Sequence, residues 1–354
     1  MTLAKQLVAV VALTVAVAVA AGGSMAQTGG LTCGATITVD TTLEADLTDC
    51  PSNGLVIGAD NITVDLNGHT ISGDGKPVRR CRRDQICDVG VANDDHAGVT
   101  IRSGSVRGFA IGVGVFRGRN DRFVELNSSR NQFFGFVIGG SSRTVIRDSS
   151  GHDNPRPDGD GLGVFMSHDL RIVHNSFRRN GQLGMHIDGS TENLIKGNVV
   201  ARNGDFGILL DGDRNQLRGN HSVRDGVAGI QVGPGSRNVI AGNRIDGSGE
   251  GIGLENGRGT VIARNVIVGV RHDGIRLGMW DPPIGNARTV VRRNLVIGSG
   301  RDGYRVAQRD RRALLVGNIA RRSGDDGFDI DSRSARLQHN RALGSDGAEF
   351  ELRG

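Results

Sequence analysis

Apolar and polar residues alternate in short runs along most of the chain, and the runs recur at a regular spacing. One run follows a glycine and has apolar residues one and three positions after it, as in Gly-Ile-x-Leu. Two further runs place an apolar residue three positions before and two positions after an asparagine. Because alternate residues of a strand face the same side, each run predicts a short strand with an apolar inner side.

The asparagine gives the length of the repeat. Most of its spacings are 22 or 23 residues, along the series Asn175, Asn198, Asn220, Asn243, Asn265, Asn294, Asn318 and Asn340. A period of this length is typical of a solenoid. Two or three short strands per turn, stacked on the like strands of the next turn, predict an all-β parallel β-helix of about 12 turns. Neither a helical periodicity nor the leucine spacing of leucine-rich repeats is present.

The composition agrees with this fold. The chain has 354 residues, of which 56 are glycine, and only 4% are aromatic. Bends between strands need a positive φ or a close backbone approach, which glycine allows and asparagine partly allows. An asparagine inside each bend can stack on its counterpart in the next turn and bond the turn amides. We therefore interpret the asparagine column as structural rather than catalytic.

The N-terminus predicts export. Lys5 precedes an apolar run from Leu7 to Ala21, and small residues lead up to Ala26, so residues 1–26 are interpreted as a cleaved signal peptide. The alternative is an uncleaved membrane anchor, but the run falls short of the roughly 20 residues that span a bilayer. We expect a secreted, extracellular or cell-envelope protein without a membrane span after cleavage.

Four cysteines lie in the first quarter of the chain, and the sequence allows three pairings among them. Proximity favours Cys33–Cys50 and Cys81–Cys87. A zinc site is the alternative, although no Cys-x-x-Cys pair is present. The predicted organisation is a disulfide-stapled N-terminal cap with the first turns at 27–100, followed by the β-helix at 101–354.

The repeated Gly-Ile-x-Leu and Asn-x-Ile-x-Gly-Asn pattern resembles the right-handed parallel β-helix proteins over about residues 55–350. That group includes pectate lyases, polygalacturonases, alginate lyases, mannuronan C5-epimerases and periplasmic carbohydrate-binding repeat proteins. The resemblance implies a single-stranded, right-handed parallel β-helix and a polysaccharide partner. It does not choose among the reactions, because the repeated residues build the fold.

The strand after the glycine column carries the candidate chemistry. Its outward positions include His186, Asp188, Asp211 and Glu255. Asp188 and Asp211 occupy the same column one turn apart, about 5 Å between backbones. Like charges this close raise a pKa or bind a cation. The catalytic candidates are therefore His186, Asp188 and Asp211, and the metal candidates are Asp188, Asp211 and Asp213, with Ca²⁺ as the cofactor considered.

Two insertions flank this strand column, at residues 154–160 and 278–284. They are expected to form the walls of a groove whose floor carries the candidate residues. The substrate-binding candidates are Glu255, Arg276, Trp280 and Arg305. An exposed Trp280 would stack on a sugar face; the alternative is that it anchors its loop on the rod.

A second acidic cluster lies near the C-terminus, at Asp325, Asp326, Asp329 and Asp331. Its Gly-Asp-Asp segment resembles a polygalacturonase motif, which would imply hydrolysis by paired carboxyls. The companion Asn-Thr-Asp and Gly-His-Gly motifs are absent. Asp-Gly-Phe-Asp also resembles a calcium-binding segment of some pectate lyases, and the alternative is a solvated final turn with acidic caps.

Lyases and epimerases of uronic acids share a first step, in which a base removes the C5 proton while a cation or donor neutralises the carboxylate. We expect an exported protein that binds and modifies an anionic polysaccharide by β-elimination or C5-epimerisation. The alternatives are a non-catalytic carbohydrate- or surface-binding rod and a polygalacturonase-like hydrolase. The net charge of +5 is dispersed and lacks interleaved aromatics, which argues against nucleic acid. The sequence does not indicate the oligomeric state.

Overall fold

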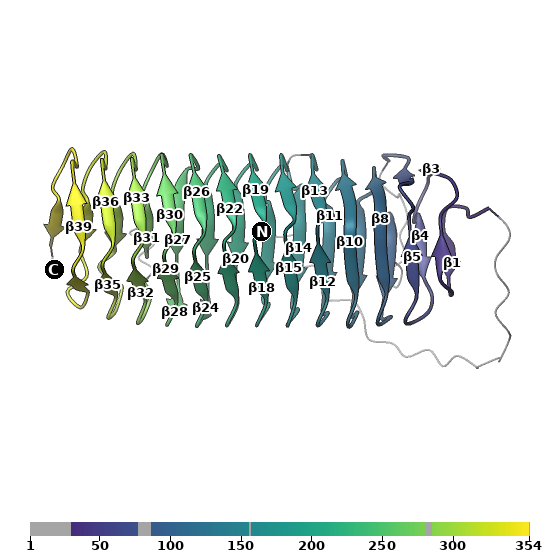
Figure 1. Cartoon of the computed structure of the whole chain (residues 1–354), viewed down its shortest axis with the longest axis horizontal. Coiled ribbons are helices and arrows are strands. Elements are labelled where there is room, and N and C mark those ends of the chain that lie inside the picture. Colours follow the sequence, from purple (N-terminus) through teal and green to yellow (C-terminus); the bar gives the residue numbers. More distant parts are fainter. Residues whose placement is uncertain (1–29, 77–85, 156, 280–284, 354) are drawn as a thin grey trace.

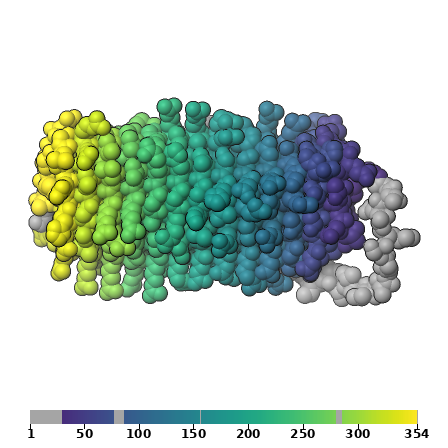
Figure 2. Space-filling model, viewed as in Figure 1, coloured from purple at the N-terminus to yellow at the C-terminus, as the bar shows by residue number. Residues whose placement is uncertain are grey.

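The protein is a long rod of stacked β-strands (Figures 1 and 2). The computed structural model describes residues 30–76, 86–155, 157–279 and 285–353. The predicted signal peptide, Cys81 and Trp280 lie outside these residues. The described strands pair in parallel throughout, and the chain makes about 13 turns, one more than the repeat predicted. At about 4.8 Å per turn the rod is about 60 Å long.

Three parallel ladders run along the rod, one strand of each per turn. The first ladder has fourteen strands. These are β1 (Ala35–Ile37), β4 (Leu55–Ile57), β7 (Val89–Asp94), β9 (Ile111–Phe116), β11 (Phe134–Gly139), β14 (Asp160–Phe165), β17 (Met185–Asp188), β20 (Phe206–Leu210), β23 (Ala228–Val232), β27 (Glu250–Leu254), β31 (Ile275–Leu277), β34 (Tyr304–Val306), β37 (Phe328–Ile330) and β40 (Phe350–Leu352).

The second and third ladders are joined where β8 (Thr100–Arg107) and β10 (Arg122–Ser129) run through both. The second ladder also contains β2 (Thr41–Thr42), β5 (Thr63–Asp65), β12 (Val145–Arg147), β15 (Arg171–Val173), β18 (Leu194–Lys196), β21 (Gln216–Arg218), β25 (Val239–Ala241), β29 (Val261–Ala263), β32 (Val290–Arg292), β35 (Leu314–Val316) and β38 (Arg336–Gln338).

The third ladder also contains β3 (Leu47–Cys50), β6 (Thr70–Gly73), β13 (Ser150–His152), β16 (Ser176–Arg178), β19 (Val199–Ala201), β22 (His221–Val223), β26 (Arg244–Asp246), β30 (Val266–Val268), β33 (Leu295–Ile297), β36 (Ile319–Arg321) and β39 (Arg341–Leu343). A short pair, β24 (Gly235–Ser236) and β28 (Gly257–Arg258), lies apart from these ladders.

The predicted inward columns form the core. Ile187 and Leu210 of the first ladder, Ile195 of the second and Val200 of the third are all fully buried. Each is paired in register with its counterpart one turn away, so aliphatic side chains stack along the rod. The strand assignment made from the sequence is confirmed.

The asparagine column is also confirmed as structural. Asn198 Nδ2 donates to Asn220 Oδ1 at 3.0 Å, and the same Oδ1 accepts the Asn198 backbone N–H at 3.0 Å. The pattern continues turn by turn, so each buried amide is satisfied by its neighbours. The asparagines themselves do not take the positive φ that the sequence suggested. The preceding residue does, as at Gly197 (φ 65°) and Gly219 (φ 59°).

Glycine is required at the beginning of the first-ladder strands for a different reason. A Cβ on Gly207 would lie 2.6 Å from the carbonyl oxygen of Gly229 in the next turn. Gly184 meets Gly207 in the same way at 2.5 Å. Close approach between turns, rather than backbone conformation, therefore requires glycine in this column.

The N-terminal segment is part of the solenoid, because β1 already pairs with β4 in the first ladder. The disulfide Cys33–Cys50 joins this end, with a Cα–Cα distance of 5.4 Å, as predicted. Cys87 is disulfide-bonded as well, and Cys81, its predicted partner, is outside the described residues. Within the described ranges, no helix is long and apolar enough to cross a membrane.

Candidate functional site

The side of the first ladder that faces away from the core is called here the outer face. Strand register places three columns on it. His186 lies in the middle column between Gly163 and Leu209, and Asp188 pairs with Phe165 in the column nearer the strand ends. Asp160 starts β14 in the column nearer the strand starts. The predicted outward orientation of His186 and Asp188 agrees with their partial or full exposure.

His186 lies next to a buried carboxylate. Its Nδ1 lies 3.6 Å from Asp160 Oδ2, and Asp160 is 2% exposed. Burial raises the pKa of Asp160, and the His186 contact opposes that rise. The Phe165 ring meets the imidazole edge-on, with centroids 5.3 Å apart. No described residue hydrogen-bonds the second ring nitrogen, Nε2, and the side chain is 20% exposed, so that nitrogen is open to a ligand.

Asp188 and Asp211 lie on adjacent turns of the outer face, as predicted. Burial, followed by the charge of Asp188, raises the pKa of Asp211 to about 6. One Asp211 oxygen, Oδ1, is buried without a hydrogen-bond partner. It lies over Gly233 of the next turn, where a Cβ would approach it to 2.0 Å. Asp211 is thus a desolvated carboxyl that retains a proton more readily than an exposed one.

Asp213 does not join this pair. Its Oδ1 accepts the Ser236 backbone N–H at 2.7 Å and the Ser236 hydroxyl at 2.9 Å. Within the described part of the chain, the one group of three carboxylates close enough to share an ion is Asp302, Asp326 and Asp329. The structure therefore does not assemble Asp188, Asp211 and Asp213 into a three-carboxylate site.

Arg276 is held by two acids from earlier turns. Its guanidinium donates to both oxygens of Glu250 at 2.6 and 2.9 Å and to Glu255 at 3.0 Å. A fourth bond goes to the Gly278 carbonyl. Burial lowers the pKa of Arg276, but the two glutamates outweigh it and the net shift is upward. Arg276 and Glu255, both candidates for substrate binding, are thus engaged with each other.

The C-terminal acidic cluster differs from the predicted one. Asp302 and Asp326 lie in one outer-face column, and Asp329 lies beside them. All three are at most 5% exposed, with carboxylate oxygens within 4.8 Å of one another. Asp325, placed in the cluster from the sequence, is exposed instead.

These carboxyls are poorly solvated. Burial and then Asp273 raise the pKa of Asp302 to about 7, and burial and then Asp331 raise that of Asp329 to about 6. Arg305 approaches Asp329 at 3.7 Å and Asp273 at 3.9 Å. Their oxygens, within 4.8 Å of one another, are closer than the about 6.5–9.5 Å between the carboxyls of inverting glycosidases. The cluster therefore does not favour inverting hydrolysis.

Sequence reasoning missed Asp160 and Glu250 as partners of His186 and Arg276. Each starts its strand one column away from the residue that it contacts, in an earlier turn, so only the register reveals the pair. The signal for Asp160 was its place as the last residue of the first insertion.

The outer face of the turns that precede His186 is apolar. Val89 and Val137 are buried there under the rings of Phe116, Phe134 and Phe165.

Comparison with known proteins identifies the fold. The profile of the family described as "Right handed beta helix region" matches residues 87–224, and that of "Periplasmic copper-binding protein (NosD)" matches residues 201–281. Together with the parallel ladders, these matches identify the chain as a right-handed parallel β-helix protein. No curated protein matches the sequence significantly.

Solved structures agree on the fold. The periplasmic alginate epimerase AlgG is similar at a TM-score of 0.66 and 16% identity, over 82% of this chain and 76% of that one. The pre-mature gene product 12 of bacteriophage phi29 has a TM-score of 0.58 and 11% identity, over 90% and 52%. The GH87 α-1,3-glucanase of Streptomyces thermodiastaticus has a TM-score of 0.50 and 13% identity, over 92% and 64%.

Proposed function

We propose that this protein is exported, binds an anionic polysaccharide along the outer face, and modifies its uronate residues by β-elimination or C5-epimerisation. The observation that carries the proposal is the His186–Asp160 pair, in which a buried carboxylate faces one imidazole nitrogen and leaves the other open. At 3.6 Å the pair is longer than a hydrogen bond, and it would fix the tautomer and orientation needed by a general base once it tightens around a bound substrate. The fold shared with a periplasmic alginate epimerase is consistent with this proposal.

His186 Nε2 would take the C5 proton of a bound uronate. The resulting charge spreads onto the sugar carboxylate and needs neutralisation. Asp211, whose pKa is raised to about 6, would bond that carboxylate when it carries its proton, which it does more often than an exposed aspartate. Alternatively, Asp188 and Asp211 would hold a Ca²⁺ ion that neutralises it. In elimination the C4–O bond then breaks, a C4–C5 double bond forms, and the leaving O4 takes a proton from water or from protonated His186. In epimerisation a proton from water is delivered to the opposite face of C5, and His186 releases its own proton to solvent.

The test is turnover of defined polymers. The mature protein is incubated with pectate, alginate and glycosaminoglycans, with Ca²⁺ or with a chelator, and followed by absorbance of unsaturated uronates and by NMR of the uronate signals. H186Q and D160N should each lower the rate by about 100-fold or more. The matched controls are H168Q and D169N, which alter an exposed His–Asp pair with an Nδ1–Oδ2 distance of 3.0 Å on another part of the rod.

Unchanged turnover in H186Q would contradict the role of His186. One observation supports the second candidate, a non-catalytic glycan-binding rod: Arg276 is fully engaged by Glu250, Glu255 and Gly278, so it offers no free cation to a substrate carboxylate. Binding of a glycan without any change in absorbance or NMR signals, on every polymer, would favour that candidate.

A further inference from the structure

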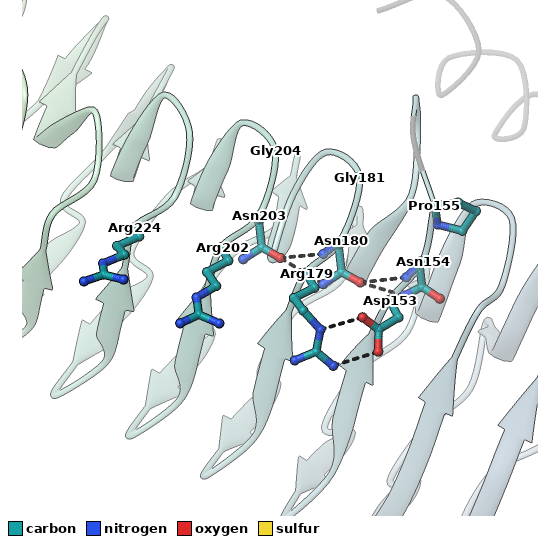
Figure 3. Close-up of a pocket in the computed structure, with 10 residues that line it drawn as sticks. All are labelled: Asp153, Asn154, Pro155, Arg179, Asn180, Gly181, Arg202, Asn203, Gly204 and Arg224. Atoms are coloured by element: carbon teal, nitrogen blue, oxygen red, sulfur yellow. Dashed lines mark hydrogen bonds and ion pairs between the residues drawn. The ribbon is translucent and has the colours of Figure 1, made fainter.

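A row of arginines marks the corner between the third and first ladders. Arg179, Arg202 and Arg224 end β16, β19 and β22 one residue beyond each strand, and all three are exposed. Their backbone N–H groups donate to the corresponding carbonyl of the next turn, as Arg202 does to Val223 at 2.9 Å. The backbones of the three arginines therefore repeat at the turn spacing, about 4.8 Å, and Figure 3 shows their side chains side by side along the rod.

Each arginine occupies a left-handed backbone conformation, with φ of 53°, 57° and 55°. Such a conformation costs a non-glycine residue roughly 1–2 kcal/mol. Later turns of the same corner use Gly247, Gly269 and Gly298 at this position, also with positive φ. The fold therefore accepts glycine here, and arginine adds a cation without being needed for the bend.

The floor beneath the arginines is rigid and internally satisfied. Asn154 Nδ2 donates to Asn180 Oδ1 at 2.9 Å, and Asn180 Nδ2 donates to Asn203 Oδ1 at 3.0 Å (Figure 3). Asn203 Nδ2 in turn donates to Asp225 Oδ1 at 2.9 Å. Both N–H groups of each of these buried side-chain amides are already bonded. Together with the arginines they line a pocket of about 400 Å³. Its ten lining residues include three arginines and one aspartate and no aromatic ring.

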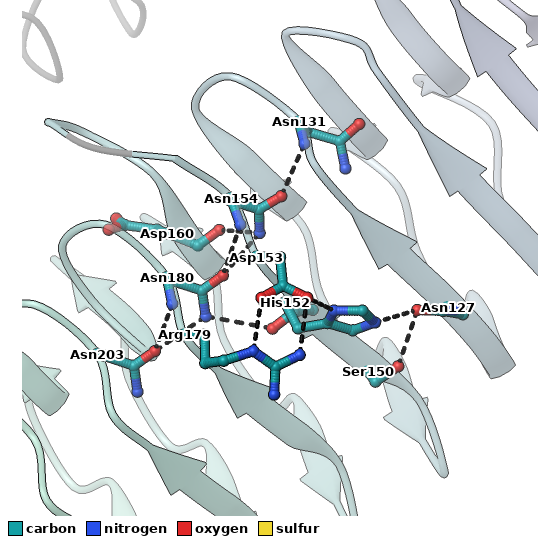
Figure 4. Close-up of polar contacts among 11 residues, drawn as sticks. Asn127, Asn131, Ser150, His152, Asp153, Asn154, Asp160, Arg179, Asn180 and Asn203 are labelled. Atoms are coloured by element: carbon teal, nitrogen blue, oxygen red, sulfur yellow. Dashed lines mark hydrogen bonds and ion pairs between the residues drawn. The ribbon is translucent and has the colours of Figure 1, made fainter.

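The protein itself shows how the row binds a carboxylate. Asp153 occupies the same corner position one turn before Arg179, and the two form a bidentate pair at 2.6 and 2.7 Å. This contact is the largest cause that lowers the pKa of Asp153 to about 2. His152 Nδ1 fixes the same carboxylate from the other side at 2.6 Å (Figure 4). Arg202 and Arg224 have no ion-pair partner among the described residues.

We propose that Arg202 and Arg224, next to the Arg179–Asp153 pair, form a second glycan-binding site that takes successive acidic groups of a polysaccharide lying along the corner. Each guanidinium presents the fork that Arg179 already uses on Asp153. The site is additional to the outer face and rests on the proposed function only for the class of partner. The absence of an aromatic ring from the pocket lining disfavours single-stranded nucleic acid, which binds by stacking.

The experiment measures affinity for an oligogalacturonate and a heparin oligosaccharide, which separate carboxylate from sulfate recognition. R202G/R224G should weaken binding of at least one of them by about tenfold. Glycine suits the left-handed positions, so the variant should unfold at the wild-type temperature or slightly above it. The matched control is R237G/R288G, which removes two exposed left-handed arginines from another corner and should stay within about twofold of wild type.

Equal affinities for wild type and R202G/R224G would overturn the proposal. An equal loss in both double variants would also overturn it, because net charge alone would explain the binding. The proposal would also be overturned if duplex DNA bound as tightly as the oligosaccharides and lost as much affinity in R202G/R224G. The proposed function is tested separately: H186Q should retain binding at the corner while turnover is lost, and R202G/R224G should still turn over short oligosaccharides.

Discussion

Single positions in this protein are set by their counterparts one turn away. Gly207 is glycine because Gly229 approaches it, and Asn198 is asparagine because Asn220 and Asn175 bond it. The physical cause differs between the two columns, although both recur once per turn. A substitution should therefore be judged by the groups that it leaves unpaired in the neighbouring turns.

N220A tests this view of the asparagine column. The substitution removes four hydrogen bonds: Asn220 Oδ1 no longer accepts from the Asn198 backbone N–H and Nδ2, and Asn220 Nδ2 no longer donates to the Ile195 carbonyl and to Asn243 Oδ1. Because these groups are buried, the expected cost is about 3 kcal/mol. N340A, at the half-buried end of the same column, should cost about 1 kcal/mol. Thermal unfolding measures both, and equal losses would contradict cooperative stacking.

At the scale of elements, the strands of the outer face carry different chemistry along the rod. Apolar residues lie on β7, β9 and β11, and the His186–Asp160 pair lies on β17 and β14. A group of buried carboxyls lies on or next to β34 and β37. The carboxyls on β37 and just before β34 and β37 repel one another in a poorly solvated place. Their raised pKa values mean that these strands are more stable when the carboxyls are protonated.

The pH dependence of D302N checks this. Burial, followed by the charge of Asp273, raises the pKa of Asp302 from 3.8 to about 7 in the folded state. Its favourable contribution to stability is therefore complete below pH 3.8 and is lost as the pH rises through 7. D302N keeps an oxygen that can accept the Asp326 N–H and cannot ionise. It should raise stability by about 2 kcal/mol at pH 8, after allowance for solvent screening, and by much less at pH 5.

Thermal unfolding across pH 5–8 measures the effect. D325N is the control, since Asp325 is an exposed carboxyl in the next turn, beside Asp326. Its profile should follow the wild type. A D302N profile parallel to the wild type would show that Asp302 does not titrate in this range.

For the whole molecule, periodicity predicted the ladders and the inward columns, because each column depends on residues within one strand. Side-chain contacts between different columns in different turns depend on how the strands are paired in register, so they could not be predicted from the sequence. This explains why His186 was predicted and Asp160 was not, although residue 160 ended a recognised insertion. The arginine row was missed for a different reason. Arg179, Arg202 and Arg224 recur at the repeat spacing, but they precede buried polar residues of a second column that the asparagine alignment did not include.

A deletion of one complete turn tests whether the rod is modular. Removing residues 220–242 joins Gly219 to Asn243. The repeat stays in register because Gly219 takes the place of the equivalent Gly242, and both have a positive φ, of 59° and 65°. Neighbour-only contacts predict a folded rod about 5 Å shorter, measured by circular dichroism and small-angle scattering. His186, Asp160 and Asp211 are retained, so any outer-face turnover should persist, whereas loss of Arg224 should weaken corner binding.

The control is a deletion of half a turn. Removing residues 220–230 alone should unfold or aggregate the protein, because half a turn brings unlike strands together. If both deletions unfold the protein alike, its stability depends on the full stack rather than on nearest neighbours.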